Sequence, residues 1–251
     1  MLSKNKIKDL LSLSQKKQRD EKGLFIAEGN KLVAELLPTF RCTTLVATSE
    51  WLSANKPTCA NIIDISETEL KKISLQKTPQ QVFAVFEKPT YTLNSNLINK
   101  ALSLALDDIQ DPGNMGTIIR IADWFGIENI FCSLHCADVY NPKTVQATMG
   151  AIARVKIFQV DLPSFLQEQK NSFPIFGTFL DGENMYAENL PDKGIIVMGN
   201  EGNGISPEVE QQINKRLFIP NYPADRSTSE SLNVAVATAI VCAEFRRRSL
   251  K

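Results

Sequence analysis

After residue 100 the chain repeats one pattern: a short, unbroken apolar run followed by a segment long enough for a helix. The apolar runs cover residues 102–106, 129–132, 155–158, 175–180, 195–198 and 217–219. Strands that are apolar at every position are typical of a parallel sheet covered on both faces. Because these runs alternate with helical segments, the pattern predicts a doubly wound α/β domain.

The first 87 residues predict a smaller α/β domain. An amphipathic basic helix is predicted over residues 3–19, and short strands are predicted at 24–27, 44–47, 62–65 and 82–86. Ser66 and Glu69 have the spacing of a helix capping box. The polar, proline-containing stretch that follows is typical of a linker. We therefore predict an N-terminal domain over 1–88, a linker over 89–98 and a larger domain over 99–251.

Charge alone predicts no polyanionic partner, because the chain has 28 Lys or Arg residues and 28 Asp or Glu residues. Residues 1–22 are locally basic, with seven cations against three acids, and the C-terminus carries Arg246, Arg247, Arg248 and Lys251. We interpret both clusters as solvated helix faces. No apolar run approaches the roughly 20 residues of a membrane span, and no export signal is recognisable. With five scattered cysteines, these features predict a cytoplasmic protein with reduced thiols and no membrane contact.

A metal site is not predicted. Cys132 and Cys136 flank His135, but His135 is the only histidine and no second pair completes a four-ligand zinc site. A single histidine also makes a Ser-His-Asp triad unattractive.

Polar side chains gather instead where three predicted strands end. Asn114 and Arg120 follow the first run, Glu201 lies in the glycine-rich stretch 199–204, and Ser231 and Asn233 begin the last helix. Ligands of open α/β sheets bind beyond the carboxyl ends of the strands. Each feature alone is better explained as a turn, an exposed helix residue or a helix cap. Their convergence favours one shared pocket.

The sequence disfavours two nucleotide-binding motifs, the dinucleotide-binding loop and the P-loop. Its order, Gly199-x-x-Gly202-x-Gly204, reverses that of a dinucleotide loop, and the next strand ends in Ile219-Pro220 without an acidic residue for a ribose. No Gly-Lys-Ser/Thr motif occurs either, which excludes a P-loop. A nicotinamide-dependent oxidoreductase is therefore not supported.

Read together, the three loops resemble the SpoU (TrmH-like) branch of the SPOUT RNA methyltransferases. The first motif of that family matches Asn114-Met115-Gly116 followed by Arg120, and the second matches residues 198–204. The third matches Ile219-Pro220 and then residues 231–238. In the N-terminal part, residues 25–29 and 78–82 look like the RNA-binding extension of the family. The stretch 220–231 is longer than is usual there, which bears on substrate contacts more than on the cofactor.

The resemblance implies a fold and an activity that composition would not have revealed. It implies a C-terminal parallel-sheet SPOUT domain with a deep trefoil knot, an exception to the usual connection rules, beside a small N-terminal α/β RNA-binding domain. It also implies a homodimer through the C-terminal domain, S-adenosylmethionine as cofactor, and methylation of a ribose 2′-hydroxyl in structured RNA. The residues implied to bind the cofactor are Thr178, Gly199, Asn200, Gly202, Ile219 and Leu232.

The residues implied to be catalytic are Arg120, Asn114, Glu201, Ser231 and Asn233. Because an arginine stays protonated, we expect Arg120 to bind a phosphate and stabilise the developing alkoxide rather than to act as a base. The other four are expected to hold the loops and the ribose. Ribosomal RNA is the expected substrate, with transfer RNA as an alternative and a non-catalytic RNA-binding protein of the same fold as another.

Overall fold

The computed structural model describes residues 2–93, 101–223 and 231–249. The chain forms two compact units, one made of Met1–Thr90 with Asp138–Ala153 and the other of Tyr91–Ala137 with Arg154–Lys251. None of the helices within the described ranges combines the length and the apolar composition that a membrane crossing requires. Half of the predicted linker, residues 94–98, lies outside the described residues.

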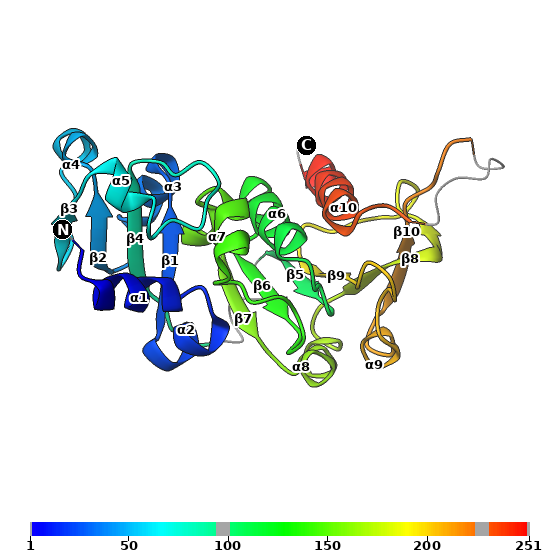
Figure 1. Cartoon of the computed structure of the whole chain (residues 1–251). Helices are drawn as coiled ribbons and strands as arrows, with labels where there is room; N and C mark the ends of the chain where they lie inside the picture. The colour runs from blue at the N-terminus through cyan, green and yellow to red at the C-terminus, as the bar shows by residue number, and fades with distance from the viewer. Residues whose placement is uncertain (1, 94–100, 224–230, 250–251) are drawn as a thin grey trace. The chain divides into compact units, whose positions relative to one another are not determined.

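The first unit is built on a four-stranded mixed sheet in the order β1-β4-β2-β3 (Figure 1). β4 pairs antiparallel with both β1 and β2, whereas β3 pairs parallel with β2. The strands are β1 (Leu24–Glu28), β2 (Cys42–Ala47), β3 (Ile62–Asp64) and β4 (Val82–Glu87). The helices from the N-terminal sequence are α1 (Lys4–Ser12), α2 (Lys16–Lys22), α3 (Asn30–Leu36), α4 (Ser49–Asn55) and α5 (Glu67–Leu70).

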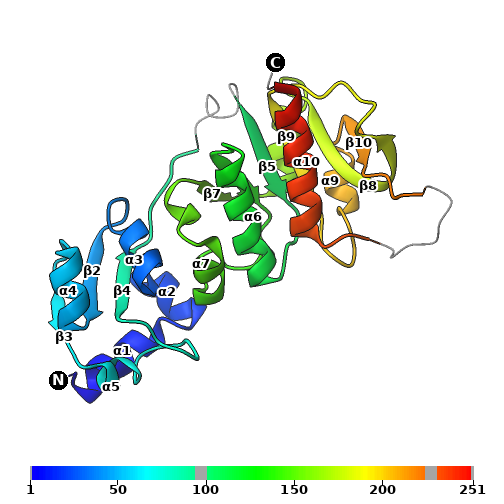
Figure 2. The same ribbon diagram turned by 90° about the horizontal axis from the view of Figure 1, so that it is seen from above.

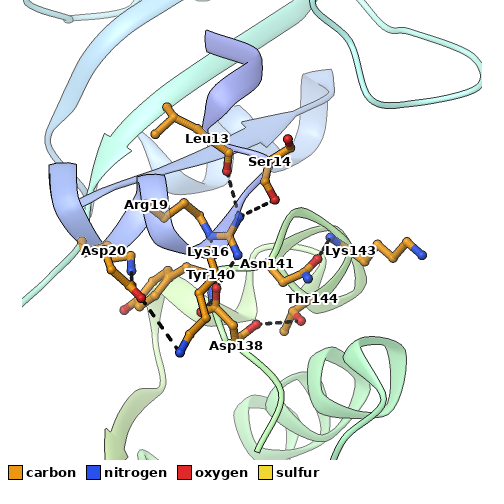
Figure 3. A network of polar contacts seen from close by, with 11 residues as sticks. Leu13, Ser14, Lys16, Arg19, Asp20, Asp138, Tyr140, Asn141, Lys143 and Thr144 are labelled. Carbon is orange, nitrogen blue, oxygen red and sulfur yellow. Dashed lines mark hydrogen bonds and ion pairs between the residues drawn. The ribbon is translucent and has the colours of Figure 1, made fainter. Parts of the chain in front are cut away.

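The single helix predicted over residues 3–19 is wrong, because the chain forms α1 and α2 with a break between them. Side-chain hydroxyls compete with the helix at the break: Ser12 Oγ donates to Asp9 O at 2.6 Å, and Ser14 Oγ donates to Leu11 O at 2.7 Å. The carbonyls of Leu13 and Ser14 accept hydrogen bonds from Arg19 Nη1, at 2.8 and 2.7 Å (Figure 3).

Arg19 also corrects the interpretation of the basic N-terminus as a solvated face. Its side chain is 1% exposed, and its Nε and Nη2 lie 3.1 and 2.5 Å from Asp138 Oδ2 (Figure 3). A charged side chain is almost never this buried unless it is paired and hydrogen-bonded. The buried cation therefore anchors a segment that lies 119 positions away in the sequence.

That segment, Asp138–Ala153, contains α7 (Pro142–Thr148) and the 3₁₀-helix η2 (Ala151–Ala153). The predicted boundaries assigned it to the larger domain, but it packs in the first unit. Besides the ion pair to Arg19, the Tyr140 ring lies against Phe25, with ring centroids 5.0 Å apart. The first unit is thus assembled from two separate stretches of sequence.

The second unit is built on a six-stranded sheet in the order β10-β8-β9-β5-β6-β7, in which every pair is parallel. The predicted strand at 102–106 is reproduced without change, and the others agree within a few residues. The strands are β5 (Leu102–Leu106), β6 (Asn129–Cys132), β7 (Lys156–Gln159), β8 (Ile175–Asn184), β9 (Gly194–Met198) and β10 (Lys215–Phe218).

Helices cover both faces of this sheet (Figures 1 and 2). On one face, Leu166 and Val209 pack in one core cluster with Ile195 and Val197 of β9. On the other face, the α10 residue Phe245 packs on Phe176 of β8. The helices of this unit are α6 (Pro112–Trp124), α8 (Leu162–Gln169), α9 (Pro207–Glu210) and α10 (Val234–Ser249).

The sequence after the first apolar run predicts a helix from about residue 117 to 125, ended by Gly126, but α6 begins five residues earlier. Asp111 caps it by accepting a hydrogen bond from the Asn114 N–H at 2.7 Å, and Pro112 occupies its first turn, where no N–H is needed. Asn114 therefore lies in the first turn of a helix rather than in an exit loop. The helix ends where predicted, at Gly126 with a φ of 62°, and Arg246 of α10 donates to the carbonyls of Phe125 and Gly126.

Candidate active site

A tight loop follows β9 and carries the glycine-rich motif. Asn200 and Gly204 exchange two backbone hydrogen bonds, at 2.8 and 3.0 Å, and Gly204 has a φ of 71°, which favours glycine. A Cβ atom on Gly199 would lie 2.4 Å from the carbonyl carbon of Gly204. The two glycines therefore let the chain leave the strand and fold back against its own backbone.

The side chain of Asn200 holds this loop from inside. Its Oδ1 accepts hydrogen bonds from the N–H groups of Gly202 and Asn203, at 2.9 and 3.0 Å. Its Nδ2 donates to the carbonyl of Asp108, just beyond β5, at 2.8 Å. These three side-chain bonds, together with the two backbone bonds to Gly204, make Asn200 a residue that positions the loop.

Three predicted catalytic residues from distant parts of the sequence form one hydrogen-bonded chain. Asn114 Nδ2 donates to Glu201 Oε1 at 2.8 Å, and Asn233 Nδ2 donates to Asn114 Oδ1 at 3.0 Å. Asn233 Oδ1 also accepts the N–H groups of Ala235 and Val236, which caps α10. The amide of Asn114 thus links the glycine-rich loop to the start of the last helix.

A cavity of about 570 Å³ opens beside this chain at the carboxyl ends of β8, β9 and β10. This volume is within the range of small-molecule sites. All six predicted cofactor-binding residues line it, together with Glu201 and Ser231. They are Thr178, Gly199, Asn200, Gly202, Ile219 and Leu232.

The cavity exposes backbone groups that the fold leaves unused. Within the described part of the chain, the N–H and C=O groups of Gly199, Ile219 and Leu232 make no hydrogen bond. Backbone polar groups are strong donors and acceptors and are normally paired in folded proteins. Three loops therefore present free donors and acceptors to one cavity, alongside the apolar side chains of Leu180 and Leu232.

Thr178 lies inside a strand rather than at its end, because β8 extends to Asn184. It nevertheless follows Gly177, the last residue of β8 that pairs with β9. Its Oγ1 lies 3.5 Å from the carbonyl of Val197 and faces the cavity. Thr178 therefore lies at the site because β8 stops pairing with β9 at Gly177, and not because β8 itself ends there.

Arg120 is exposed on α6 and does not line the cavity. Its guanidinium has no hydrogen-bond or ion-pair partner among the residues that the structure describes. Ser231 is exposed at the cavity wall and has no described side-chain bond. Most of the unusually long stretch 220–231 lies outside the described residues.

Sequence reasoning missed three residues of the cavity wall: Phe179, Leu180 and Glu210. Arg216 lies over the Phe179 ring, 3.6 Å from its centroid, and pairs with Glu210 and Asp181. The Arg216 hydrogen bond lowers the pKa of the Asp181 carboxyl. The cation directly before the predicted strand at 217–219 was a detectable signal, but its ring partner lies on β8, where the β8–β10 pair shifts in register.

Cys132 and Cys136 lie near the same edge of the sheet. Their mutual hydrogen bond is the main cause of a lowered pKa for Cys136, about 7. No group of three metal-ligating side chains gathers here or elsewhere in the described ranges.

The comparisons agree on one family. The model of the SpoU rRNA methylase family matches residues 101–243, and that of an MRM3-like substrate-binding domain matches residues 4–84. The chain is 31% identical to the 23S rRNA (guanosine(2553)-2′-O)-methyltransferase RlmP of Bacillus subtilis, over 96% of both chains.

Two solved structures are similar over nearly their whole length. A Porphyromonas gingivalis protein assigned to the TrmH family of RNA methyltransferases is 45% identical, with a TM-score of 0.90 over 99% of both chains. An AdoMet-bound rRNA methyltransferase from Sinorhizobium meliloti is 29% identical, with a TM-score of 0.85 over 100% of this chain and 97% of that one.

Proposed function

The chain belongs to the SpoU rRNA methylase family, and from that premise we propose that it methylates a ribose 2′-hydroxyl of ribosomal RNA with S-adenosylmethionine. Relatives that bear rRNA 2′-O-methyltransferase names support the reaction class and the RNA class. One observation supports it most strongly: residues of three separate segments with no described backbone hydrogen bond line one cavity beside the Glu201–Asn114–Asn233 chain.

The lining of the cavity suits S-adenosylmethionine. Gly199, Ile219 and Leu232 would hold its polar edges through backbone donors and acceptors, and the apolar side chains would cover its adenine. Glu201 places a carboxylate at the wall of a site for a sulfonium cation, whereas the charge of Glu210 is paired with Arg216. When bound, S-adenosylmethionine supplies an electrophilic methyl group, so the protein needs no metal for this chemistry.

The remaining task of the protein is to orient the 2′-oxygen and stabilise the charge that develops on it. Well-oriented reactants account for a large part of the lowering of a barrier. We assign Arg120 to a neighbouring phosphate and to the developing alkoxide, because it stays protonated and has no described partner to compete. Asn114, Glu201, Ser231 and Asn233 keep the loops and the ribose in position.

Three further features belong to the proposal. We propose that the path around β10 and α10 forms the trefoil knot of the family, that two copies associate through the second unit, and that the enzyme acts in the cytoplasm. The parallel sheet and the whole-length structural similarity support the first. Size-exclusion chromatography with light scattering tests the second.

The role of Arg120 is tested by replacing it with Ala. We expect methyl transfer to fall about 100- to 1000-fold, the usual loss of one transition-state donor, while affinity for S-adenosylmethionine stays nearly constant. Transfer to ribosomal and transfer RNA from a deletion strain is measured with labelled cofactor, and cofactor affinity by calorimetry. Lys193→Ala, which removes another exposed cation of the same unit, is the control.

The outcomes separate the alternatives. Loss of cofactor affinity in Arg120→Ala would contradict the assigned role. Cofactor binding by the wild type without transfer to either RNA would favour a non-catalytic RNA-binding protein. Transfer to transfer RNA alone would replace the RNA class and keep the reaction.

A further inference from the structure

The first unit contains a second cavity, of about 330 Å³, that the methyl-transfer chemistry does not use. Its walls come from the end of β1, from residues 75 and 76, and from α7. The substrate-binding family model ends at residue 84, whereas α7 lies within the methylase match. The cavity is therefore composite in sequence, although all of its residues belong to one compact unit.

Glu28 fixes one wall of this cavity. Its carboxylate, 7% exposed, accepts hydrogen bonds from Ser74 Oγ at 2.5 Å and from the Leu75 N–H at 2.9 Å. Burial raises the pKa of this carboxyl above its ordinary value. Both oxygens are engaged, so Glu28 holds the segment that carries Leu75 and Gln76 into the cavity.

Two glutamines form the polar part of the lining. Gln76 Nε2 donates to Gln146 Oε1 at 3.0 Å and to the carbonyl of Glu28 at 3.2 Å. These bonds use both hydrogens of the Gln76 amide. Gln76 Oε1 and Gln146 Nε2 have no partner within the described ranges, so one acceptor and one donor remain free on paired amides.

The rest of the lining is apolar, with one cation. Leu75 is 44% exposed, and Ala27 and Pro142 line the cavity with it. Lys143 also lines it and has no described ion-pair partner. Figure 3 shows its side chain extending away from the Arg19–Asp138 network.

These features describe a specific kind of ligand. Its faces must be apolar, its edge must carry both a donor and an acceptor, and an anionic group must lie beside it. A nucleotide has this combination, and proteins recognise RNA mostly through unpaired bases that are hydrogen-bonded on their edges. A cavity of this size admits one base but not a duplex.

We propose that this cavity binds an unpaired nucleotide of the RNA substrate. The base lies against Leu75 and Pro142, its edge bonds to Gln76 and Gln146, and Lys143 contacts its phosphate. The inference rests on the proposed function for the identity of the polymer. It makes α7, which belongs to the methylase sequence, a part of the RNA-binding surface.

The test uses the full-length protein and two probes: in vitro transcribed 23S ribosomal RNA, and the same RNA containing 4-thiouridine for photocrosslinking. The double variant Gln76→Ala/Gln146→Ala is expected to bind the RNA about tenfold more weakly, the loss of two hydrogen bonds. Lys143→Ala is expected to lower the salt dependence of binding by about one phosphate contact. Gln167→Ala, an exposed glutamine of α8, is the control and should bind normally.

Crosslinks to peptides that contain residues 75–76 or 143–146 are expected in the wild type. Unchanged RNA affinity in the double variant, with its melting temperature intact, would overturn the proposal, as would crosslinks confined to other peptides. Capture of a protein segment in place of RNA would overturn it as well. If RNA binding depends on the cavity but no methyl group is transferred, the proposed function fails and this inference stands.

Discussion

The two cavities of this protein differ in the kind of polar group that they offer to a ligand. In the second unit, Gly199, Ile219 and Leu232 offer backbone groups. The nearby side-chain amides of Asn114 and Asn200 instead form hydrogen bonds to other parts of the chain. In the first unit, side chains of Gln76 and Gln146 are themselves the free groups. A backbone site tolerates side-chain changes as long as the loops keep their shape. A side-chain site can change its specificity by substitution.

The two units also differ in what stabilises them. The second has a parallel sheet with apolar helices on both faces. The first joins two stretches of sequence around a buried ion pair, Arg19–Asp138. A buried pair adds little net stability over apolar packing, but breaking it leaves an uncompensated charge. Removing one charged side chain of this pair is therefore expected to destabilise the first unit strongly.

The largest expected effect comes from Arg19→Ala. It leaves Asp138, whose side chain is only 12% exposed, without its cation, so we expect the free energy of unfolding to fall by about 3–5 kcal/mol. Chemical denaturation followed by circular dichroism measures this change. S-adenosylmethionine affinity, which belongs to the second unit, should change little. Arg41→Ala is the matched control, since Arg41 pairs with Glu87 but is 75% exposed, and it should cost less than about 1 kcal/mol.

Adding Asp138→Asn to Arg19→Ala sharpens this experiment. The double variant removes the orphaned charge, so it should recover part of the lost stability. If Arg19→Ala and Arg41→Ala cost the same, the first unit does not depend on its buried ion pair. Deleting residues 1–90 is a poorer test, because it also strips Asp138–Ala153 of its packing partners.

The next largest effect is expected from Gly199→Ala, which tests whether ligand binding in the larger cavity depends on the backbone shape of its glycine-rich loop. The new Cβ would lie 2.4 Å from the Gly204 carbonyl carbon and 2.5 Å from the Ile205 nitrogen, so the loop must move. Displacement of about 1 Å at a catalytic site costs about 100-fold, and we expect cofactor affinity, measured by calorimetry, to fall by that factor. At Gly202 the nearest atom to a new Cβ is 3.6 Å away, so Gly202→Ala should lose far less. Equal losses would mean that loop shape is not the cause.

Much of the second unit could be predicted because its signals are local. Continuous apolar runs marked the buried parallel strands, and the rule that ligands bind at strand ends brought Asn114, Glu201 and Asn233 together correctly. In the first unit, the capping box of Ser66 and Glu69 is likewise confirmed by both of its backbone hydrogen bonds, at 3.3 and 3.4 Å. Each of these inferences needs only neighbouring residues or one topological rule.

Two failures were local, namely the break between α1 and α2 and the early start of α6, whereas the others involve partners far apart in the sequence. Arg19 was assigned to a solvated face because the residues around it are charged, and nothing local indicates Asp138. The same pairing moved α7 out of the predicted domain. Phe179 and Glu210 were missed because both contact Arg216, which lies 37 and 6 positions away from them, and nothing in the local sequence indicates these contacts.

The smallest expected effect concerns Glu28→Gln. This variant tests whether the buried Glu28 carboxylate, in the wall of the smaller cavity, ionises without a cation beside it. Burial raises the pKa of Glu28 from its ordinary value of 4.5. A raised pKa means that the unfolded chain releases the proton first as the pH rises, so the wild type loses stability above pH 4.5. Glutamine does not ionise and can still accept the Leu75 N–H. We therefore expect the variant to gain stability relative to the wild type as the pH rises above 4.5, with no further change below pH 4.5. Thermal melts across this range measure the difference. If the variant instead loses stability relative to the wild type as the pH rises, the ionised carboxylate is stabilised by its surroundings. Lys143 lines the same cavity, so Lys143→Ala would then test whether its charge stabilises the carboxylate.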